Sequence, residues 1–218
     1  MRIALLGAEC TGKTQLATEL LRALNTPPGS AVGVPEVLRA WCVANARTPQ
    51  EHEQEAIARQ QAASVERLSD PGYIIADTTP LMTAIYSELL FQDSTLYPFA
   101  LEHQRQYGLT LVMGLDLPWV ADGIQRDGSA VRAQVDVRLR QVLETHALPY
   151  CMVYGRGTAR SGCALQAIAH QCNLASAKAV TRASNWQWNC EKCSDARCEH
   201  QMFSALLKAD SMRSRSAR

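Results

Sequence analysis

The 218-residue sequence lacks two features that would direct a protein to a membrane or to nucleic acid. No apolar run approaches the ~20 residues of a membrane span, and the first apolar stretch is too short for a secretory signal. The 22 lysine and arginine residues nearly balance 21 aspartate and glutamate residues, which leaves a net charge of +1. Since neither sign dominates, we expect a cytoplasmic protein with no membrane or nucleic-acid partner, in which any affinity for phosphate is local.

Residues 7–14 form a glycine-rich phosphate-binding motif. They fit G-x-x-x-x-G-K-[ST] without a mismatch, follow a short apolar run at 2–6 and precede leucines at helical spacing. Successive backbone N–H groups and the helix dipole of such a loop point at one anion. On this model Lys13 reaches the β- and γ-phosphates of ATP, and the Thr14 hydroxyl joins the Mg²⁺ shell. The predicted nucleotide-binding residues are Gly7, Ala8, Glu9, Cys10, Thr11, Gly12, Lys13 and Thr14.

Two acidic residues follow predicted strands and are candidates for catalysis. Glu36 comes after the run 31–34, and Asp77 comes after the run 73–76. The carboxyl ends of parallel strands form the ligand-binding edge of the sheet. Either carboxylate is therefore placed to take a proton from an attacking hydroxyl. Asp77 is also a candidate Mg²⁺ ligand. Each has a structural alternative. Glu36 would merely start the next helix, or Asp77 would merely cap the helix that follows it.

The remaining pattern completes an alternation of strands and helices. A capping-box pattern at Thr48 predicts a long polar helix to about Leu68, with a solvated face formed by Gln54, Arg59, Gln60 and Gln61. Further helices are expected at 81–91, 98–107 and 129–147, with a last one ending near Cys172, and strands at 109–113 and 148–154. The sequence therefore predicts an α/β P-loop NTPase fold of three layers, with a five-stranded parallel sheet between helices.

Residues 119–128 have the composition of a mobile lid, with glycines around a tryptophan and an arginine. Phosphoryl transfer needs positive charge at the γ-phosphate when the site is closed, because water competes with the acceptor. Arg126 is the leading candidate, and Arg132 and Arg138 on the following helix are expected helpers. For Arg138 a purely structural surface role is the simpler alternative. Residues 155–157 are adenine-side candidates by analogy of fold.

The motifs together resemble those of the NadR-type ribosylnicotinamide kinases. The resemblance rests on residues 7–14, 35–39, 76–79 and 119–123, and it extends over roughly residues 1–170. It implies a nucleoside/NMP-kinase-like domain that transfers the γ-phosphate of ATP to the 5′-hydroxyl of nicotinamide riboside. The product would be the mononucleotide used in NAD synthesis. Because the P-loop begins at residue 7, we expect a stand-alone kinase.

The C-terminal region carries a separate cysteine-rich extension. Cys190, Cys193, Cys198 and His200 follow the pattern C-x₂-C-x₄-C-x-H, which suits a structural Zn²⁺ site. The alternatives are an iron–sulfur cluster with Cys172 as the fourth thiolate, or reduced cysteines. We therefore predict a kinase domain at residues 1–172, the extension at 173–210 and a flexible tail at 211–218.

The leading functional hypothesis is a small-molecule kinase whose partner is a nucleoside substrate. Lys13 and Thr14 would hold MgATP, Asp77 or Glu36 would deprotonate the acceptor, and Arg126 would stabilise the moving phosphoryl group. The alternatives are a kinase for a different nucleoside and a regulatory ATP-binding module that signals to a partner through the cysteine-rich extension. A nucleic-acid-linked ATPase is disfavoured because a basic surface signal is missing. No pattern in the sequence indicates the oligomeric state.

Overall fold

The computed structural model describes residues 1–69, 71–118 and 129–179. The chain divides into one unit of Met1–Ala175 and a second of Ser176–Arg218. Several residues singled out above lie outside the described residues. These are the lid arginine Arg126 and the candidate zinc ligands Cys190, Cys193, Cys198 and His200. The lid and the zinc site therefore stay predictions.

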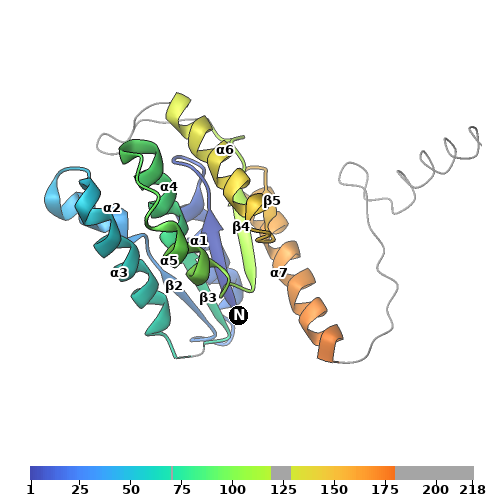
Figure 1. Cartoon of the computed structure of the whole chain (residues 1–218). Coiled ribbons are helices and arrows are strands. Elements are labelled where there is room, and N and C mark those ends of the chain that lie inside the picture. The colour runs from blue at the N-terminus through green and yellow to red at the C-terminus, as the bar shows by residue number, and fades with distance from the viewer. Residues whose placement is uncertain (70, 119–128, 180–218) are drawn as a thin grey trace, which may run out of the picture. The chain divides into compact units, whose positions relative to one another are not determined.

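A five-stranded parallel sheet forms the centre of the first unit (Figure 1). Its strands lie in the order β2-β3-β1-β4-β5, so the first strand of the chain is the middle strand of the sheet. The predicted parallel sheet is confirmed. The strands are β1 (Arg2–Leu6), β2 (Ala31–Val34), β3 (Tyr73–Asp77), β4 (Leu109–Met113) and β5 (Cys151–Val153).

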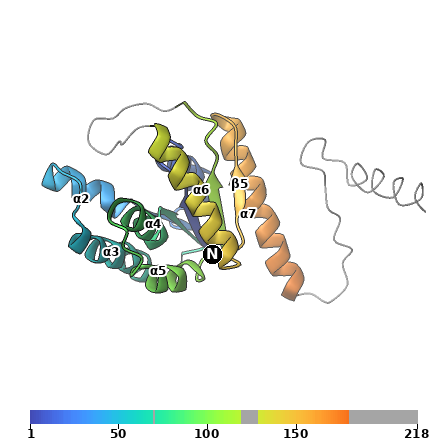
Figure 2. The same cartoon turned by 45° about the horizontal axis from the view of Figure 1, so that its top comes forward.

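Helices cover both faces of this sheet, as Figures 1 and 2 show. Helices α4, α5 and α6 pack on one face, and α1 and α7 pack on the other. The arrangement is the predicted three-layer fold. The helices are α1 (Lys13–Leu24), α2 (Val37–Asn45), α3 (Gln54–Glu66), α4 (Pro80–Phe91), α5 (Tyr97–Gln104), α6 (Ser129–Thr145) and α7 (Thr158–Ala179), with a short 3₁₀ helix, η1 (Glu51–Glu53), before α3.

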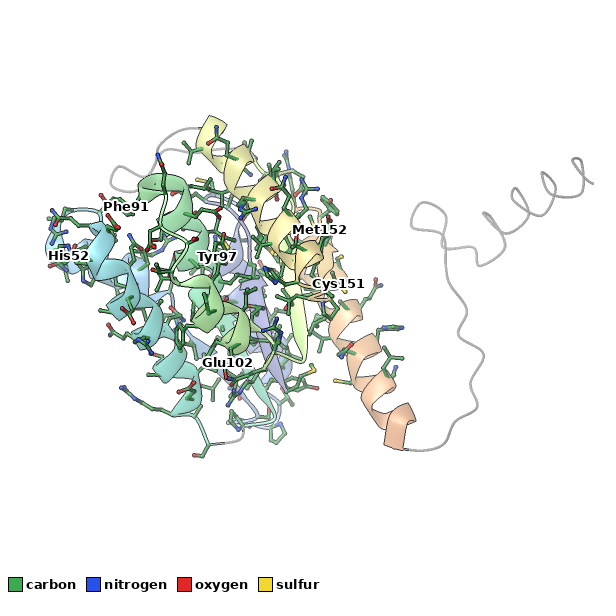
Figure 3. The ribbon with its side chains drawn as sticks, in the orientation of Figure 1. His52, Phe91, Tyr97, Glu102, Cys151 and Met152 are labelled. Atoms are coloured by element: carbon green, nitrogen blue, oxygen red, sulfur yellow. The ribbon has the colours of Figure 1, made fainter. Side chains whose placement is uncertain are left out.

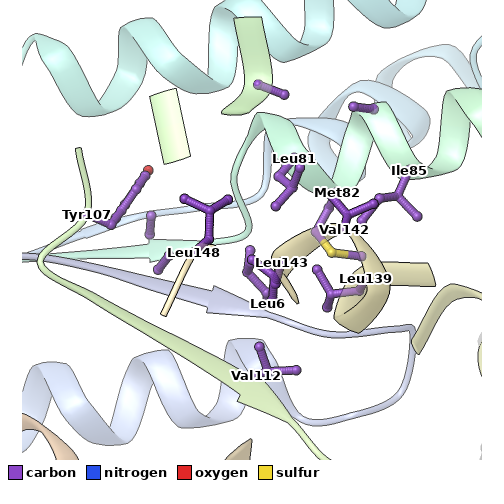
Figure 4. Packing of buried hydrophobic residues seen from close by; sticks show 14 of the residues in the cluster. Leu6, Leu81, Met82, Ile85, Tyr107, Val112, Leu139, Val142, Leu143 and Leu148 are labelled. Carbon is purple, nitrogen blue, oxygen red and sulfur yellow. The ribbon is translucent and has the colours of Figure 1, made fainter. Parts of the chain in front are cut away.

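The core lies in two layers because successive side chains of each strand point to opposite faces. Ala4 and Leu6 of β1 belong to the cluster under α4, α5 and α6, whereas Ile3 and Leu5 belong to the cluster under α1 and α7. Figure 4 shows the first cluster, in which Leu6 and Val112 of the sheet lie near Leu139 of α6. Burial on both faces explains why these strands read as continuous apolar runs.

Some element boundaries differ from the sequence prediction. Strand β5 begins at Cys151, because the backbone N–H of Leu148 donates to Leu143 O at 2.8 Å and completes the end of α6. The last helix continues past Cys172 to Ala179. Side chains fill the space between helices and sheet in Figure 3, where Tyr97 marks the start of α5 and Cys151 the start of β5.

The segment after Thr48 starts its helix later than predicted. Gln50, rather than Thr48, forms the capping box, and its N–H donates to the Glu53 carboxylate at 2.8 Å. Arg47 donates two hydrogen bonds of 2.7 Å to the same carboxylate and lowers the pKa of Glu53 to about 2. This anchored turn forms η1, and α3 begins only at Gln54.

Only two of the four side chains predicted to form the solvated face of this helix are exposed. Arg59 and Gln60 are exposed, as predicted. Gln54 and Gln61, however, are each only 2% exposed. Seven residues separate these two glutamines, which is close to two helical turns, so they lie on one side of α3. That side packs inward.

Helix α5 carries a buried histidine. His103 is 2% exposed, and its ring stacks near those of Phe99 and Tyr107, with centroid separations of 6.4 and 5.5 Å. Neither ring nitrogen has a hydrogen-bond partner among the described residues. Burial penalises the charged imidazolium and lowers the pKa of His103 from its ordinary value of 6.5. Burial therefore favours the neutral form of this ring in the folded protein.

We expect the free energy of unfolding to fall as the pH is lowered from about 7.5 to about 5.5. Below pH 6.5 the unfolded chain binds a proton at His103 that the folded chain resists, so acid favours unfolding. His103→Phe should flatten this part of the stability profile, measured by urea denaturation across the pH series. His146→Phe, at an exposed position, serves as the control and should keep the slope. Equal slopes in the two variants would contradict the account.

Candidate active site

The glycine motif forms a tight loop between β1 and α1. Gly7 has φ of +144° and Gly12 has φ of +78°, which are backbone angles that residues with a Cβ rarely adopt. A Cβ at Gly7 would also lie 3.0 Å from the Cβ of Met113. Lys13, which follows Gly12, is the first residue of α1. The loop therefore joins the middle strand directly to a helix N-terminus, which is the arrangement that binds phosphate.

Lys13 lies within the curve of this loop. The side chain is largely buried, and its Nζ donates to Gly7 O at 2.9 Å and to Ala8 O at 3.0 Å. Thr11 adds a hydrogen bond from its hydroxyl to Ala8 O at 2.8 Å. The loop therefore holds a fixed positive charge beside its own backbone.

Thr14 and Asp77 meet at the start of α1, although 63 residues separate them. The Thr14 hydroxyl donates to Asp77 Oδ2 at 2.5 Å. Asp77 is 4% exposed, and its other oxygen, Oδ1, is buried with no hydrogen-bond partner among the described residues. A hydroxyl and a carboxylate are the oxygen donors that Mg²⁺ prefers, and a buried carboxylate oxygen is costly without a partner. The residues present thus fit a magnesium ion.

The capping alternative for Asp77 does not hold. Thr79 is the N-cap of α4, because its hydroxyl oxygen accepts the backbone N–H of Leu81 at 3.3 Å. The same hydroxyl donates to Gln104 Oε1 at 2.7 Å, and Gln104 donates in turn to Thr110 at 3.0 Å. This buried chain of hydrogen bonds fixes the turn after β3 and leaves the Asp77 carboxylate for Thr14.

Thr78 stands in this turn with a strained backbone. Its φ of +72° lies in the left-handed region, which a β-branched residue rarely occupies, and its N–H donates to Leu5 O at 3.1 Å. Such strain persists only where surrounding contacts hold it, and it concentrates at functional sites. Here it directs the chain from the sheet edge into the pocket described next.

A pocket that is open to solvent lies between the P-loop and helices α2, α3 and α4. Lys13 of the loop and Glu36 of the β2–α2 connection share it with Thr78. Its wall is otherwise mixed, with apolar side chains from α2 and α4. The lining residues are Gly7, Glu9, Lys13, Glu36, Leu38, Arg39, Thr48, Pro49, Gln54, Thr78, Met82, Tyr86 and Leu90.

Glu36 both starts α2 and lines the pocket. It is the N-cap residue of α2, yet its side chain makes no capping hydrogen bond and lines the pocket instead. The carboxylate pairs with Arg39 at 3.3 Å and is 13% exposed. Gln61 of α3 holds this connection, since its Oε1 accepts the Val37 N–H at 2.8 Å and its Nε2 donates to Pro35 O at 3.3 Å.

Arg160 is a site residue that the sequence analysis missed. It is 4% exposed, and its guanidinium donates to Thr11 O at 2.5 Å and to Gly155 O at 2.8 Å. A third bond reaches Asp116 Oδ1 at 2.5 Å, and the other Asp116 oxygen accepts the Gly155 N–H at 2.7 Å. Arg160 and Asp116 therefore clamp the P-loop to the connection between β5 and α7.

A second, smaller cavity lies beside this clamp, on the Gly12 side of the loop. Gly157, one of the adenine-side candidates, lines it together with Leu117. Arg132 is 7% exposed and donates to Leu117 O at 2.9 Å, so it supports this wall.

Arg138 has a structural partner. Its guanidinium donates two hydrogen bonds of 2.7 Å to Glu88 of α4 and lies 5.8 Å from the centre of the Tyr97 ring. These contacts tie α6 to α4 and α5. The simpler alternative, a structural role, accounts for Arg138.

A family model described as an AAA domain matches residues 2–160. The chain belongs to this family. No curated protein matches the sequence. Among solved structures, the fold is similar to that of NadR in complex with NAD and AMP-PNP, with a TM-score of 0.64 and 17% identity over 86% of this chain and 51% of that one.

Two further structures bear on the fold. NadR in complex with NR matches with a TM-score of 0.67 and 18% identity, covering 86% of this chain and 54% of that one. Thymidylate kinase from Candida albicans matches with a TM-score of 0.56 and 14% identity, covering 79% of this chain and 92% of that one. The chain thus spans about half the length of the NadR structures. At these identities the likeness establishes a P-loop kinase fold.

Two negative findings apply to the described part of the chain. Within it, no helix has the length and apolar character needed to cross a bilayer. Nor do three or more His, Cys, Asp or Glu side chains gather there as a metal site would require. The candidate zinc ligands are not among those residues.

We expect Arg160→Met to lower the free energy of unfolding by about 2 to 3 kcal/mol and to weaken MgATP binding about tenfold. The change removes the hydrogen bonds that Arg160 donates to two backbone carbonyls and to Asp116 Oδ1. Urea denaturation and calorimetric titration with MgATP measure the two effects. Arg67→Met is the control, because Arg67 is exposed at the end of α3 and lines neither the pocket nor the smaller cavity. Wild-type stability and affinity in Arg160→Met would show that the clamp is dispensable.

Proposed function

We propose that this protein is an ATP-dependent kinase that phosphorylates the 5′-hydroxyl of nicotinamide riboside, as a cytoplasmic step of NAD synthesis. The observation that supports it most is the hydrogen-bonded pair of Thr14 and Asp77 at the P-loop. Lys13 of the same loop lines a pocket together with Glu36. A pocket beside the P-loop with a carboxylate in its wall offers a place for an acceptor that carries a hydroxyl group.

The residues of the site divide the reaction between them. Backbone N–H groups of residues 7–14 and the Lys13 ammonium bind the phosphates of ATP. Thr14 and Asp77 would hold Mg²⁺, which would neutralise the charge of the phosphates when bound. Glu36 orients the acceptor hydroxyl in the pocket, and Glu36 or Asp77 takes its proton as the hydroxyl oxygen bonds to the γ-phosphorus and the bond to the β-phosphate oxygen breaks. Arg126 is proposed to stabilise the charge on the phosphoryl group.

The pocket chemistry favours a nucleoside as acceptor. Leu38, Met82 and Tyr86 offer apolar and aromatic surface for a flat base, while Glu36 and Lys13 offer polar groups for a sugar hydroxyl. Nicotinamide riboside is the preferred choice because the motifs resemble those of ribosylnicotinamide kinases and because one NadR structure of the same fold holds NR.

We expect the wild-type protein to convert MgATP and nicotinamide riboside to ADP and the mononucleotide, with mass spectrometry to identify the product. Asp77→Asn should lower kcat by about 10² to 10⁴-fold, because the variant loses the charge that a metal ligand or base needs. ATP should still bind to the variant in the absence of metal. Chelation of Mg²⁺ with EDTA should abolish turnover of the wild type.

Asp93→Asn, in the loop between α4 and α5, is the matched control and should keep the wild-type rate. Tight binding of MgATP by the wild type, without phosphorylation of nicotinamide riboside or any other nucleoside in a panel, would contradict the proposal. That result would favour a regulatory ATP-binding module. Phosphorylation of a different nucleoside alone would retain the kinase and correct its substrate.

A further inference from the structure

Gln54 is a buried side chain in the pocket wall for which the proposed reaction gives no role. It is the first residue of α3, is 2% exposed, and lines the pocket together with Lys13 and Glu36. Its amide oxygen, Oε1, is buried and has no hydrogen-bond partner among the described residues. A buried amide oxygen without a donor is costly, and native structures keep few of them.

Gln61 on the same helix shows that this situation is specific to Gln54. Both glutamines are 2% exposed and lie on the inward side of α3. Gln61 uses both ends of its amide, toward Val37 and Pro35. The two side chains thus share chemistry, helix and burial, but only Gln54 has an amide oxygen without a partner, and Gln54 also lines the pocket.

The residues around Gln54 suit a flat ring with a polar edge. Pro49 precedes it in the chain, and Met82 and Tyr86 of α4 belong to the same wall. Apolar side chains beside an amide orient a ring, since the amide binds one edge only. An N–H group on that edge of the ligand would satisfy Oε1.

We propose that Gln54 selects the acceptor by accepting a hydrogen bond from the exocyclic carboxamide N–H of a pyridine riboside. This inference rests on the proposed function, because it takes nicotinamide riboside as the occupant of the pocket. Gln54 is then a specificity-determining residue, and it takes no part in proton transfer or in ATP binding. Sites that bind an N–H through a buried polar group discriminate strongly against analogues that lack it, because the group is then left without a partner.

The test compares nicotinamide riboside with 3-acetylpyridine riboside, in which a methyl group replaces the amide NH₂ at nearly unchanged shape. Isothermal titration calorimetry without ATP measures binding independently of turnover. We expect wild-type protein to bind the amide at least about tenfold more tightly than the acetyl analogue. Gln54→Met, which removes the acceptor oxygen, should reduce this preference to about one. Gln54→Glu keeps an acceptor oxygen and should preserve the preference.

Gln60→Met is the matched control, because Gln60 lies on the exposed side of the same helix. It should retain the wild-type preference, and all three variants should bind MgATP as the wild type does. Two results would overturn the inference: equal affinity of wild-type protein for the two ribosides, or an unchanged preference in Gln54→Met. The first result applies even if a variant fails to fold.

The outcomes also separate this inference from the proposed function. If the wild type phosphorylates nicotinamide riboside but does not distinguish it from the acetyl analogue, only the role of Gln54 is wrong. If the wild type binds neither riboside, both the role of Gln54 and the choice of acceptor are wrong.

Discussion

The parallel pairing of β1 with β3 is the constraint on which the rest of the site depends. The register places Asp77 beside Leu5. Leu5 lies two residues before Gly7, the first glycine of the loop. Because both strands end at the same edge of the sheet, the loop after β1 and the carboxylate after β3 meet without any further device. The hydrogen bond from Thr14 to Asp77 is the direct result. A change of register by one residue would turn Asp77 to the other face of the sheet.

Buried polar groups tie the remaining parts of the site to this edge. Arg160 joins the P-loop to the β5–α7 connection, and Gln61 joins α3 to the connection that carries Glu36. Each side chain offers several donors or acceptors and has nearly all its surface buried. Such networks add little net stability when complete but penalise any arrangement that leaves one member without its partner. They therefore specify the positions of loops that the apolar core alone would leave adjustable.

Some buried polar groups have no hydrogen-bond partner among the described residues, and they occur both in the core and at the site. His103 packs against the aromatic rings of Phe99 and Tyr107 and lines no part of the pocket, so its burial is structural. Asp77 Oδ1 and Gln54 Oε1, in contrast, lie beside the P-loop and in the wall of the pocket. A buried polar atom without a partner can therefore be structural or can lie at a ligand site, and its surroundings distinguish the two cases. Unused acceptors beside a pocket are groups that a ligand can satisfy.

The sequence by itself determined the phosphate-binding loop and the order of strands and helices. Eight contiguous residues carry the loop chemistry, and apolar runs of strand length carry the sheet, so both signals are local. It also placed Glu36 and Asp77 at strand ends, where topology alone brings them to one edge. Only the tertiary structure decided the burial and the contacts of Gln54, Gln61 and Arg160. A polar residue on a helix gives no local sign of burial, because its partners lie far away in the chain. Arg160 and the Thr11 carbonyl, for example, are 149 residues apart and meet only when the sheet has formed.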